Sequence, residues 1–356
     1  MKHFIQLFKK KRLGLKPQTE DLNDYPSEVL GWGKVGYTPK KESSGLVPLT
    51  TKDQYRNTCQ WNALAGSKEI DEKIELDEQS TVLFGMREGL ISGDGFSNLR
   101  SGQLILQKYG ICRKGLLNNN RNSWNIYSNV SQLTPDVLKD ASKHKSQTFW
   151  SVSNYYQALQ ALDEGHPVCF GMGWRTSMNM NGGFSFPWLL NFLLGYLIGG
   201  HAVYIFDWKF SYQGKDCFEG KNSFGKDWGN KGSFFITFED FNKEIKKYGA
   251  YANVDIEKGV AKWLIANNGK CIKESDGVRI YFIENGKKRL FPDMLTFKAF
   301  GFSSTDIIED GEDMLREIPD GDDFSIYNSP KLGWFFELFK MDKDGILKEQ
   351  FNKYFT

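Results

Sequence analysis

The hydrophobic pattern changes near His166, and this change constrains the fold more than any other feature. Before it, apolar residues recur at helical spacing, and the segments end at glycines such as Gly110 and Gly165. After it come short aromatic and β-branched runs separated by glycine: "PVCFGMGW", "HAVYIFDW", "CFEGKNSF" and "GSFFITF". Such runs are typical of strands in a mostly antiparallel sheet. Because helices and strands are segregated, the pattern predicts an α+β fold with two lobes rather than βαβ units.

Four helices are predicted in the first half of the chain. One runs from near Cys59 to about Lys73, and a second lies in "DEQSTVLFGMREGL" with Asp77 as its N-cap. The other two lie in "SNLRSGQLILQKYG" and "VSNYYQALQALDEG". We expect these helices to form one lobe and the later strands to form the other.

The 356 residues divide into three parts by composition. Residues 1–50 have little periodicity and many turn signals, which predicts an N-terminal extended arm. Residues 51–255 hold the helices and strands described above. The composition shifts again at residues 256–356, where "GVRIYFIENGKKRLF" predicts a hairpin turning at Asn285-Gly286. We interpret this part as a small C-terminal α+β accessory or interaction module.

Charge and cysteine content exclude several classes of function. The 46 Lys and Arg nearly cancel the 44 Asp and Glu, so nucleic acid is not expected as a partner. The five cysteines are widely spaced and form no CxxC pair, so neither a disulfide framework nor a structural zinc site is expected. The simpler interpretation is a reducing compartment. We expect no metal and no cofactor.

Two segments bear on membranes and localisation. The start, "MKHFIQLFKKKRLG", is basic and lacks the apolar run and cleavage site of a signal peptide. The compartment stays open, with cytoplasmic or virion-associated as the favoured options. The run from Ser185 to Phe206 has no charged residue and could span a bilayer, but Gly199-Gly200 divides it. We therefore expect an apolar helical insert followed by a buried strand, "HAVYIF", and consider membrane insertion unfavoured.

A reactive thiol is predicted in the stretch "DQYRNTCQWNALAG", which begins at Asp53. Cys59 stands where the good helix former "NALAG" follows, and a helix N-terminus favours the thiolate. Acyl transfer also needs donors for the developing oxyanion. The side-chain amide of Gln54, five residues earlier, could be one, and the backbone N–H of Cys59 could be the second.

A base for this thiol is predicted at His201. Of the four histidines, it alone enters an apolar strand, and it follows two glycines that allow close backbone approach. The later stretch "KNSFGKDWGNKGSFFITF" offers Asn222, whose carbonyl can accept from the imidazole and fix its tautomer. Phe224 and Trp228 could shield this pair.

The order Gln, Cys, His, Asn in these surroundings resembles the papain-like cysteine peptidases, most closely the short bacterial and phage branch that lacks a prodomain. The resemblance implies Cys59 as nucleophile, His201 as base and acid, Asn222 as orienting residue and Gln54 as oxyanion donor. The implied reaction is endopeptidase hydrolysis of a polypeptide through an acyl-enzyme, in a fold with a helical lobe and a β-barrel-like lobe. The substrate cleft would be lined by Trp61, Gly200, Phe224 and Trp228.

This sequence departs from the family pattern in four ways. Gln54 is one residue closer to the thiol than is usual, "NTCQ" replaces "GSCW" or "GSCT", and Phe224 replaces a tryptophan. An arm of about 50 residues is also too short for the usual inhibitory prodomain, so we expect no zymogen of that kind.

Two alternatives stay open. The chain could be a structural or binding component of a larger assembly, for example a phage particle, with reduced or no activity. Its partners would then bind through residues 1–50 and 256–356. It could also be another thiol acyl-transferase, although such enzymes often use Cys-His-His or Cys-His-Asp sets and "NSFGKDWG" favours asparagine.

Overall fold

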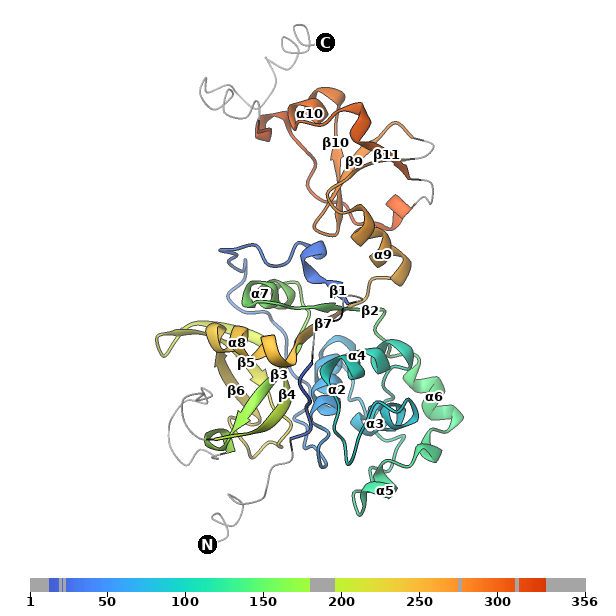
Figure 1. Cartoon of the computed structure of the whole chain (residues 1–356), viewed down its shortest axis with the longest axis vertical. Coiled ribbons are helices and arrows are strands. Elements are labelled where there is room, and N and C mark those ends of the chain that lie inside the picture. Colours follow the sequence, from blue (N-terminus) through green and yellow to red (C-terminus); the bar gives the residue numbers. More distant parts are fainter. Residues whose placement is uncertain are drawn as a thin grey trace. The chain divides into compact units, whose positions relative to one another are not determined.

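The chain forms two compact units in the computed structural model (Figure 1). The first unit extends to Ser27 and continues from Trp32 to Ile256, and the second holds Glu28–Gly31 and the chain from Glu257. The structure describes residues 13–18, 21, 24–179, 196–274, 277–310 and 314–330.

The helical part of the first unit follows the predicted pattern. Its helices are α2 (Cys59–Glu72), α3 (Glu78–Arg87), α4 (Leu99–Lys108), α5 (Trp124–Tyr127) and α6 (Pro135–Ala141), with α7 (Tyr155–Asp163) nearer the sheet. Asp77 caps α3, because its carboxylate accepts from the Gln79 N–H at 3.0 Å. Gly110 and Gly165 adopt positive φ just after α4 and α7. The four predicted helices are therefore confirmed.

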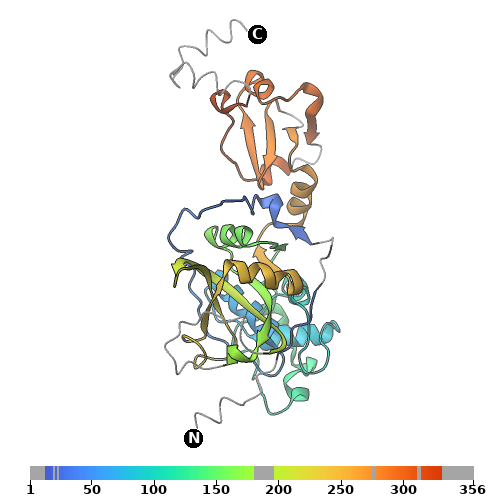
Figure 2. The ribbon, with the colours of Figure 1, turned by 60° about the vertical axis from the view of Figure 1, so that its left-hand side comes forward.

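The other part of the first unit is a seven-stranded sheet in the order β1-β2-β7-β3-β4-β5-β6 (Figure 2). All its pairs are antiparallel except β1 with β2. The four strands predicted after His166 are confirmed, but the sheet also takes two strands from the first half and is crossed by α8 (Phe238–Tyr248). The strands are β1 (Tyr25–Pro26), β2 (Thr148–Ser151), β3 (Val168–Arg175), β4 (Leu197–Tyr212), β5 (Lys215–Lys221), β6 (Ser233–Thr237) and β7 (Ala250–Val254).

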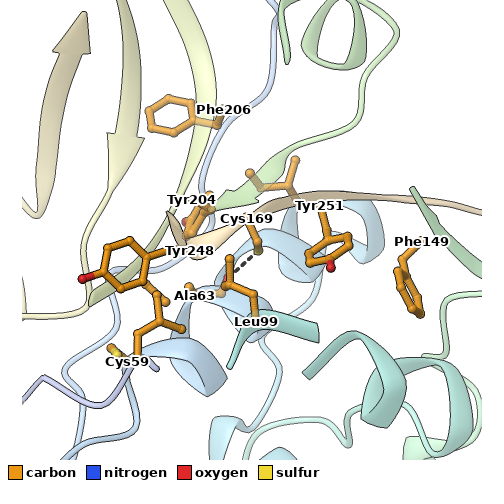
Figure 3. Close-up of a cluster of buried hydrophobic side chains, with 12 residues drawn as sticks. Cys59, Ala63, Leu99, Phe149, Cys169, Tyr204, Phe206, Tyr248 and Tyr251 are labelled. Atoms are coloured by element: carbon orange, nitrogen blue, oxygen red, sulfur yellow. Dashed lines mark hydrogen bonds between the residues drawn. The ribbon is translucent and has the colours of Figure 1, made fainter. Parts of the chain in front are cut away.

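The core of the first unit lies between α2 and the sheet. Cys59 and Ala63 on α2 join Cys169, Tyr204 and further buried residues in one cluster (Figure 3). Close approach of the helix needs a small residue at Gly66, where a Cβ would lie 2.8 Å from the Tyr204 ring. A separate cluster fills the helical part. The α+β architecture with a helical lobe and a sheet lobe is confirmed.

The second unit is a small α+β module. Its sheet has the order β10-β9-β8-β11, with β11 parallel to β8. The predicted hairpin is confirmed, and its turn has positive φ at Asn285 (56°) and Gly286 (70°). Its elements are α9 (Lys258–Asn267), β8 (Cys271–Glu274), β9 (Ile280–Glu284), β10 (Lys287–Phe291), α10 (Met294–Ala299) and β11 (Ile307–Asp310).

The run without charged residues, Ser185 to Phe206, ends in the sheet, because its last part, "HAVYIF", lies within β4 as predicted. The helical insert predicted from Ser185 to the Gly199-Gly200 pair lies mostly outside the described residues, and its last residues, Leu197 and Ile198, belong to β4 rather than to a helix. Among the residues that are described, no helix combines the length and the apolar composition needed to cross a bilayer.

Candidate active site

Cys59 is the first residue of α2, and its side chain is fully buried. The N-cap residue, Thr58, makes no side-chain cap, because its hydroxyl donates to the Tyr55 carbonyl at 2.6 Å. Burial raises the pKa of the Cys59 thiol, and the backbone N–H groups of Ala202, Gly14 and Gln60, which face the sulfur, lower it. The net direction of the pKa is upward, which disfavours the thiolate.

His201 lies on β4 opposite Met172 of β3 and is fully buried. Its Nε2 lies 2.7 Å from Asn222 Oδ1. The same oxygen accepts from the Ser223 backbone N–H at 2.7 Å, which fixes the orientation of the amide. Because Oδ1 can only accept, Nε2 carries the hydrogen and Nδ1 is the basic nitrogen.

The segments that carry the thiol and the imidazole pack together although 142 residues separate Cys59 from His201. Ala202 follows His201 directly, and its N–H faces the sulfur of Cys59. The start of α2 therefore lies against β4 at the position of the imidazole. The structure thus brings together Cys59, His201 and Asn222.

Gln54 is held next to Asn222 by hydrogen bonds between two distant segments. Its Oε1 accepts from the Ser223 hydroxyl at 2.8 Å, and its backbone N–H donates to the Ser223 carbonyl at 2.8 Å. Its Nε2 donates to the Arg56 carbonyl at 2.7 Å. Gly225 N–H donates to the Lys52 carbonyl at 2.9 Å, so the two segments pair along their length. The side-chain amide of Gln54 therefore has a fixed position. It lies just before the loop Arg56–Thr58, which leads to Cys59.

Asp94 holds the loop before the thiol, where Asn57 and Thr58 replace the smaller Gly and Ser of the family pattern. The Asp94 carboxylate accepts from Asn57 Nδ2 and lies 3.0 Å from Arg56 Nη1. The Asp94 carbonyl also accepts from the Asn57 backbone N–H at 3.2 Å. Arg56 has a φ of 54°, a strained conformation for a residue other than glycine. The contacts of Asp94 with Arg56 and with the next residue, Asn57, hold this conformation.

Three aromatic rings surround the imidazole. Trp174 lies 4.6 Å and Phe224 lies 4.7 Å from the His201 ring centroid. Trp228 contacts both rings, and its indole N–H donates to the Met178 carbonyl at 3.1 Å. Sequence reasoning named Phe224 and Trp228 but missed Trp174. Trp174 pairs with Gly199, two residues before His201 on β4. This pairing depends on the register between β3 and β4, which the sequence does not reveal.

Trp61 does not lie where the sequence predicted it. It is fully buried in the core of the helical part, in the same cluster as Leu83 and Phe84. The reason is helical geometry: two residues on from Cys59, a side chain points about 200° away around the helix. Gly200 directly precedes His201 on β4, and its carbonyl accepts from the Leu15 N–H at 3.1 Å.

The N-terminal segment covers the thiol, which the sequence did not predict. Gly14 packs on Asn57, and the Gly14 carbonyl accepts from the Ser97 N–H at 3.0 Å. Leu15 is 5% exposed and belongs to the same buried cluster as Cys59. The sequence predicted that no domain-sized inhibitory segment is present. The structure shows something smaller: Gly14 and Leu15 lie next to the thiol of Cys59.

All five cysteines are unpaired and buried, as the sequence predicted for a chain without a disulfide framework. Within the described part of the chain, no group of three or more His, Cys, Asp or Glu side chains is placed to hold a metal ion.

Comparison with known proteins identifies solved structures with a similar fold. No family model matches the chain, and no curated protein matches it. Among solved structures, xylellain, a cysteine protease from Xylella fastidiosa, is 22% identical with a TM-score of 0.53, covering 70% of this chain and 98% of that chain. Procathepsin L 3 from the larval midgut of Tenebrio molitor is 15% identical (TM-score 0.47), covering 71% of this chain and 79% of that chain. Procathepsin B S9 from Trypanosoma congolense is 14% identical (TM-score 0.44), covering 68% and 83% respectively.

The likeness to xylellain shows that this chain has the same papain-like two-lobe fold as that protein. At this level of identity the architecture is shared, and the chemistry of the site is argued from its own residues.

Proposed function

We propose that the chain is a cysteine peptidase that hydrolyses peptide bonds through an acyl-enzyme on Cys59. The observation that carries the proposal is the 2.7 Å contact between His201 Nε2 and Asn222 Oδ1 beside a thiol at the first residue of a helix. A histidine oriented by an acceptor, on a strand that packs against the start of the thiol's helix, supports this proposal, because an oriented imidazole can activate a nucleophilic cysteine.

The first chemical step transfers a proton from Cys59 Sγ to His201 Nδ1. The thiolate then attacks the scissile carbonyl carbon, and an S–C bond forms as the carbonyl oxygen becomes an oxyanion. Collapse of this intermediate breaks the C–N bond, and the leaving amine takes its proton from His201 Nδ1. Water, deprotonated by His201, then attacks the thioester and releases the carboxylic acid and the thiol.

The oxyanion would be stabilised by the Cys59 backbone N–H and the Gln54 amide. Fixed donors are effective because they need no reorganisation during the reaction. The Ser223 hydroxyl and the Arg56 carbonyl fix the Gln54 amide on both of its ends.

The test is cleavage of a peptide library by the full chain, by Cys59→Ala and by Cys169→Ala. Cys169 is a matched control, since it is buried in the same cluster and has no role in the mechanism. A Leu15→Asp variant is included, because a charged side chain is disfavoured in the apolar surroundings beside the thiol. We expect cleavage by the chain and by Cys169→Ala, and none by Cys59→Ala.

Absence of Cys59-dependent cleavage in both the wild type and Leu15→Asp would contradict the peptidase proposal. That result would favour a binding role on the same scaffold.

A further inference from the structure

A small cavity lies beside Asn222, in the region where α2 packs against β4. Its walls include Asn62 and Ala63 of α2, Tyr204 of β4 and Lys221 at the end of β5. Figure 3 shows Ala63 and Tyr204 at this contact between the helix and the strand. The cavity has room for one water molecule at most, so no larger ligand fits there.

The side-chain amide of Asn222 has one end bonded and the other end unused. Its Oδ1 accepts from His201 Nε2 and from the Ser223 backbone N–H, both at 2.7 Å. Because a backbone N–H can only donate, the amide oxygen must be the atom that faces it. Asn222 is 3% exposed, and its Nδ2 has no acceptor among the described residues. The residue that orients the proposed base therefore has a buried donor left over.

Asn62 has the complementary group left over. Its Nδ2 donates to the Thr58 carbonyl at 2.7 Å and lies 3.1 Å from the Thr58 hydroxyl oxygen. Asn62 is fully buried, and in the described part of the chain its Oδ1 accepts no hydrogen bond. One end of this amide is thus tied to the residue before Cys59, and the other end is a buried acceptor.

The hydroxyl of Tyr204 is the third unused polar group on the cavity wall. Tyr204 is 3% exposed, and its hydroxyl has no partner within the residues that the structure describes. Burial, with a smaller contribution from the negative charge of Glu69, raises the pKa of Tyr204 well above its usual value. The hydroxyl therefore keeps its hydrogen and can act as a donor.

The two lysines on the cavity wall already have partners. Lys52 Nζ donates to the Leu76 carbonyl at 2.8 Å, and Lys221 Nζ donates to the Lys231 carbonyl at 2.8 Å. What remains is a set of two donors and one acceptor. Buried polar groups in folded proteins are almost always hydrogen-bonded to protein or to ordered water, because leaving them unpaired is costly.

A single water molecule matches this set. Its two lone pairs can accept from Asn222 Nδ2 and from the Tyr204 hydroxyl, and one of its hydrogens can be donated to Asn62 Oδ1. Three hydrogen bonds are typical of a buried water.

We propose that one water molecule, bound between Asn62, Tyr204 and Asn222, makes Asn62 and Tyr204 positioning residues for Asn222. The water holds the amide of Asn222 from the end opposite to the imidazole. By accepting from Nδ2 it also polarises the amide, which strengthens Oδ1 as an acceptor for His201. The effect on catalysis rests on the proposed peptidase function, whereas the binding of the water does not.

Tyr204→Phe is the deciding variant, because it removes one hydroxyl and nothing else. If this hydroxyl has no partner, its loss costs nothing, and if it binds the water, one of three hydrogen bonds is lost. Tyr127→Phe is the matched control, since Tyr127 is fully buried in a separate cluster and its hydroxyl also lacks a partner among the described residues.

Asn62→Leu removes the acceptor for the water and is compared with Asn253→Leu, at another buried asparagine. Since Asn62→Leu also loses the bonds to Thr58, it supports Tyr204→Phe and does not replace it. Thermal unfolding followed by circular dichroism checks that each full-length protein is folded.

Two measurements do not depend on hydrolysis. A high-resolution crystal structure of the wild type should show a water within hydrogen-bonding distance of Asn222 Nδ2 and Asn62 Oδ1. In protein labelled with ¹⁵N-histidine, NMR detects the Nε2–H of His201, which is assigned by its loss in His201→Ala. We expect this signal to move upfield and to exchange faster with solvent in Tyr204→Phe and Asn62→Leu, and to be unchanged in both controls.

Steady-state kinetics on one peptide substrate gives the effect on the reaction. We expect kcat to fall about two- to tenfold in Tyr204→Phe, the effect of one hydrogen bond, with unchanged KM. The bound water and the shifted NMR signal without any hydrolysis would support the water site and overturn the peptidase function. An absent water, or a His201 signal and kcat in Tyr204→Phe equal to those of the wild type, would overturn the water site and leave the function standing.

Discussion

The indole of Trp174 lies edge-on against the imidazole of His201, with 4.6 Å between the ring centroids and 66° between the planes. Phe224 covers the same imidazole at 4.7 Å. These rings keep water away from the hydrogen bond between His201 and Asn222. A hydrogen bond shielded in this way is stronger than an exposed one.

Replacing Trp174 with phenylalanine should lower kcat by about two- to tenfold, because an edge-on aromatic pair contributes about 0.5–1.5 kcal/mol. Trp208→Phe is the control, since Trp208 is equally buried and its indole nitrogen has no hydrogen-bond acceptor among the described residues. Steady-state kinetics on one peptide substrate measures the difference. An equal decrease in both variants would show that Trp174 acts only through stability.

Asn222→Ala should lower kcat by roughly ten- to a hundredfold with little change in KM. The expected size follows from a hydrogen bond to a charged group, about 1.5–3 kcal/mol, since the imidazolium forms only during the reaction. Asn253→Ala, at another buried asparagine, serves as control. Unchanged kcat in Asn222→Ala would remove Asn222 from the proposed mechanism.

Asp94 should act as a positioning residue for the loop before the thiol. Asp94→Ala removes the hydrogen bonds from Arg56 Nη1 and Asn57 Nδ2, and Asp94→Asn keeps one acceptor oxygen. We expect kcat/KM to fall in the order wild type, Asp94→Asn, Asp94→Ala, by several-fold for each hydrogen bond removed. The prediction fails if both variants are less stable but keep the wild-type kcat/KM.

The buried ion pair of Lys52 and Glu69 should matter for stability rather than catalysis. Their side chains are 7% and 0% exposed, and Lys52 also donates to the Leu76 carbonyl at 2.8 Å. Lys52→Met leaves a buried carboxylate without its partner, which should lower the free energy of unfolding by about 3–5 kcal/mol. Urea unfolding measures this. Lys243→Met, at an exposed pair with Glu239, should cost less than about 1 kcal/mol.

Asp77 should make the stability depend on pH. Burial, with a smaller contribution from Glu78, raises its pKa from 3.8 to about 6. The folded protein therefore binds this proton more tightly, and the contribution of Asp77 to the unfolding free energy falls as pH rises from about 4 to 6. Asp77→Asn keeps a good N-cap and does not titrate. Its stability relative to the wild type should rise between pH 4 and pH 7 in urea unfolding, and a constant difference would contradict the assignment.

The helices, the main strands and the residues of the proposed site could be named from the sequence because each depends on local chemistry. A capping aspartate, a left-handed glycine and the single histidine in an apolar strand are visible in a few neighbouring residues. The contact of Asn222 with His201 was expected in the same way, from an amide followed by glycines and rings.

Features that depend on pairing between distant segments could not be predicted. Trp174 contacts the imidazole only because of the register between β3 and β4. Trp61 was expected near the thiol because it is close to Cys59 in sequence. On α2, however, two residues correspond to a turn of about 200°, so the two side chains point in nearly opposite directions. The short β1, and the docking of Gly14 on Asn57, carry no periodic signal at all.

Gly200, which bonds the covering segment, and His201, the proposed base, are consecutive residues of β4. During synthesis at about 5–20 residues per second, the thiol of Cys59 is made roughly 7–30 s before either of them. The strand that brings the base also brings the edge on which the segment docks. The proposed base and the docking edge for the segment over the thiol are therefore made within one residue of each other, on the same strand.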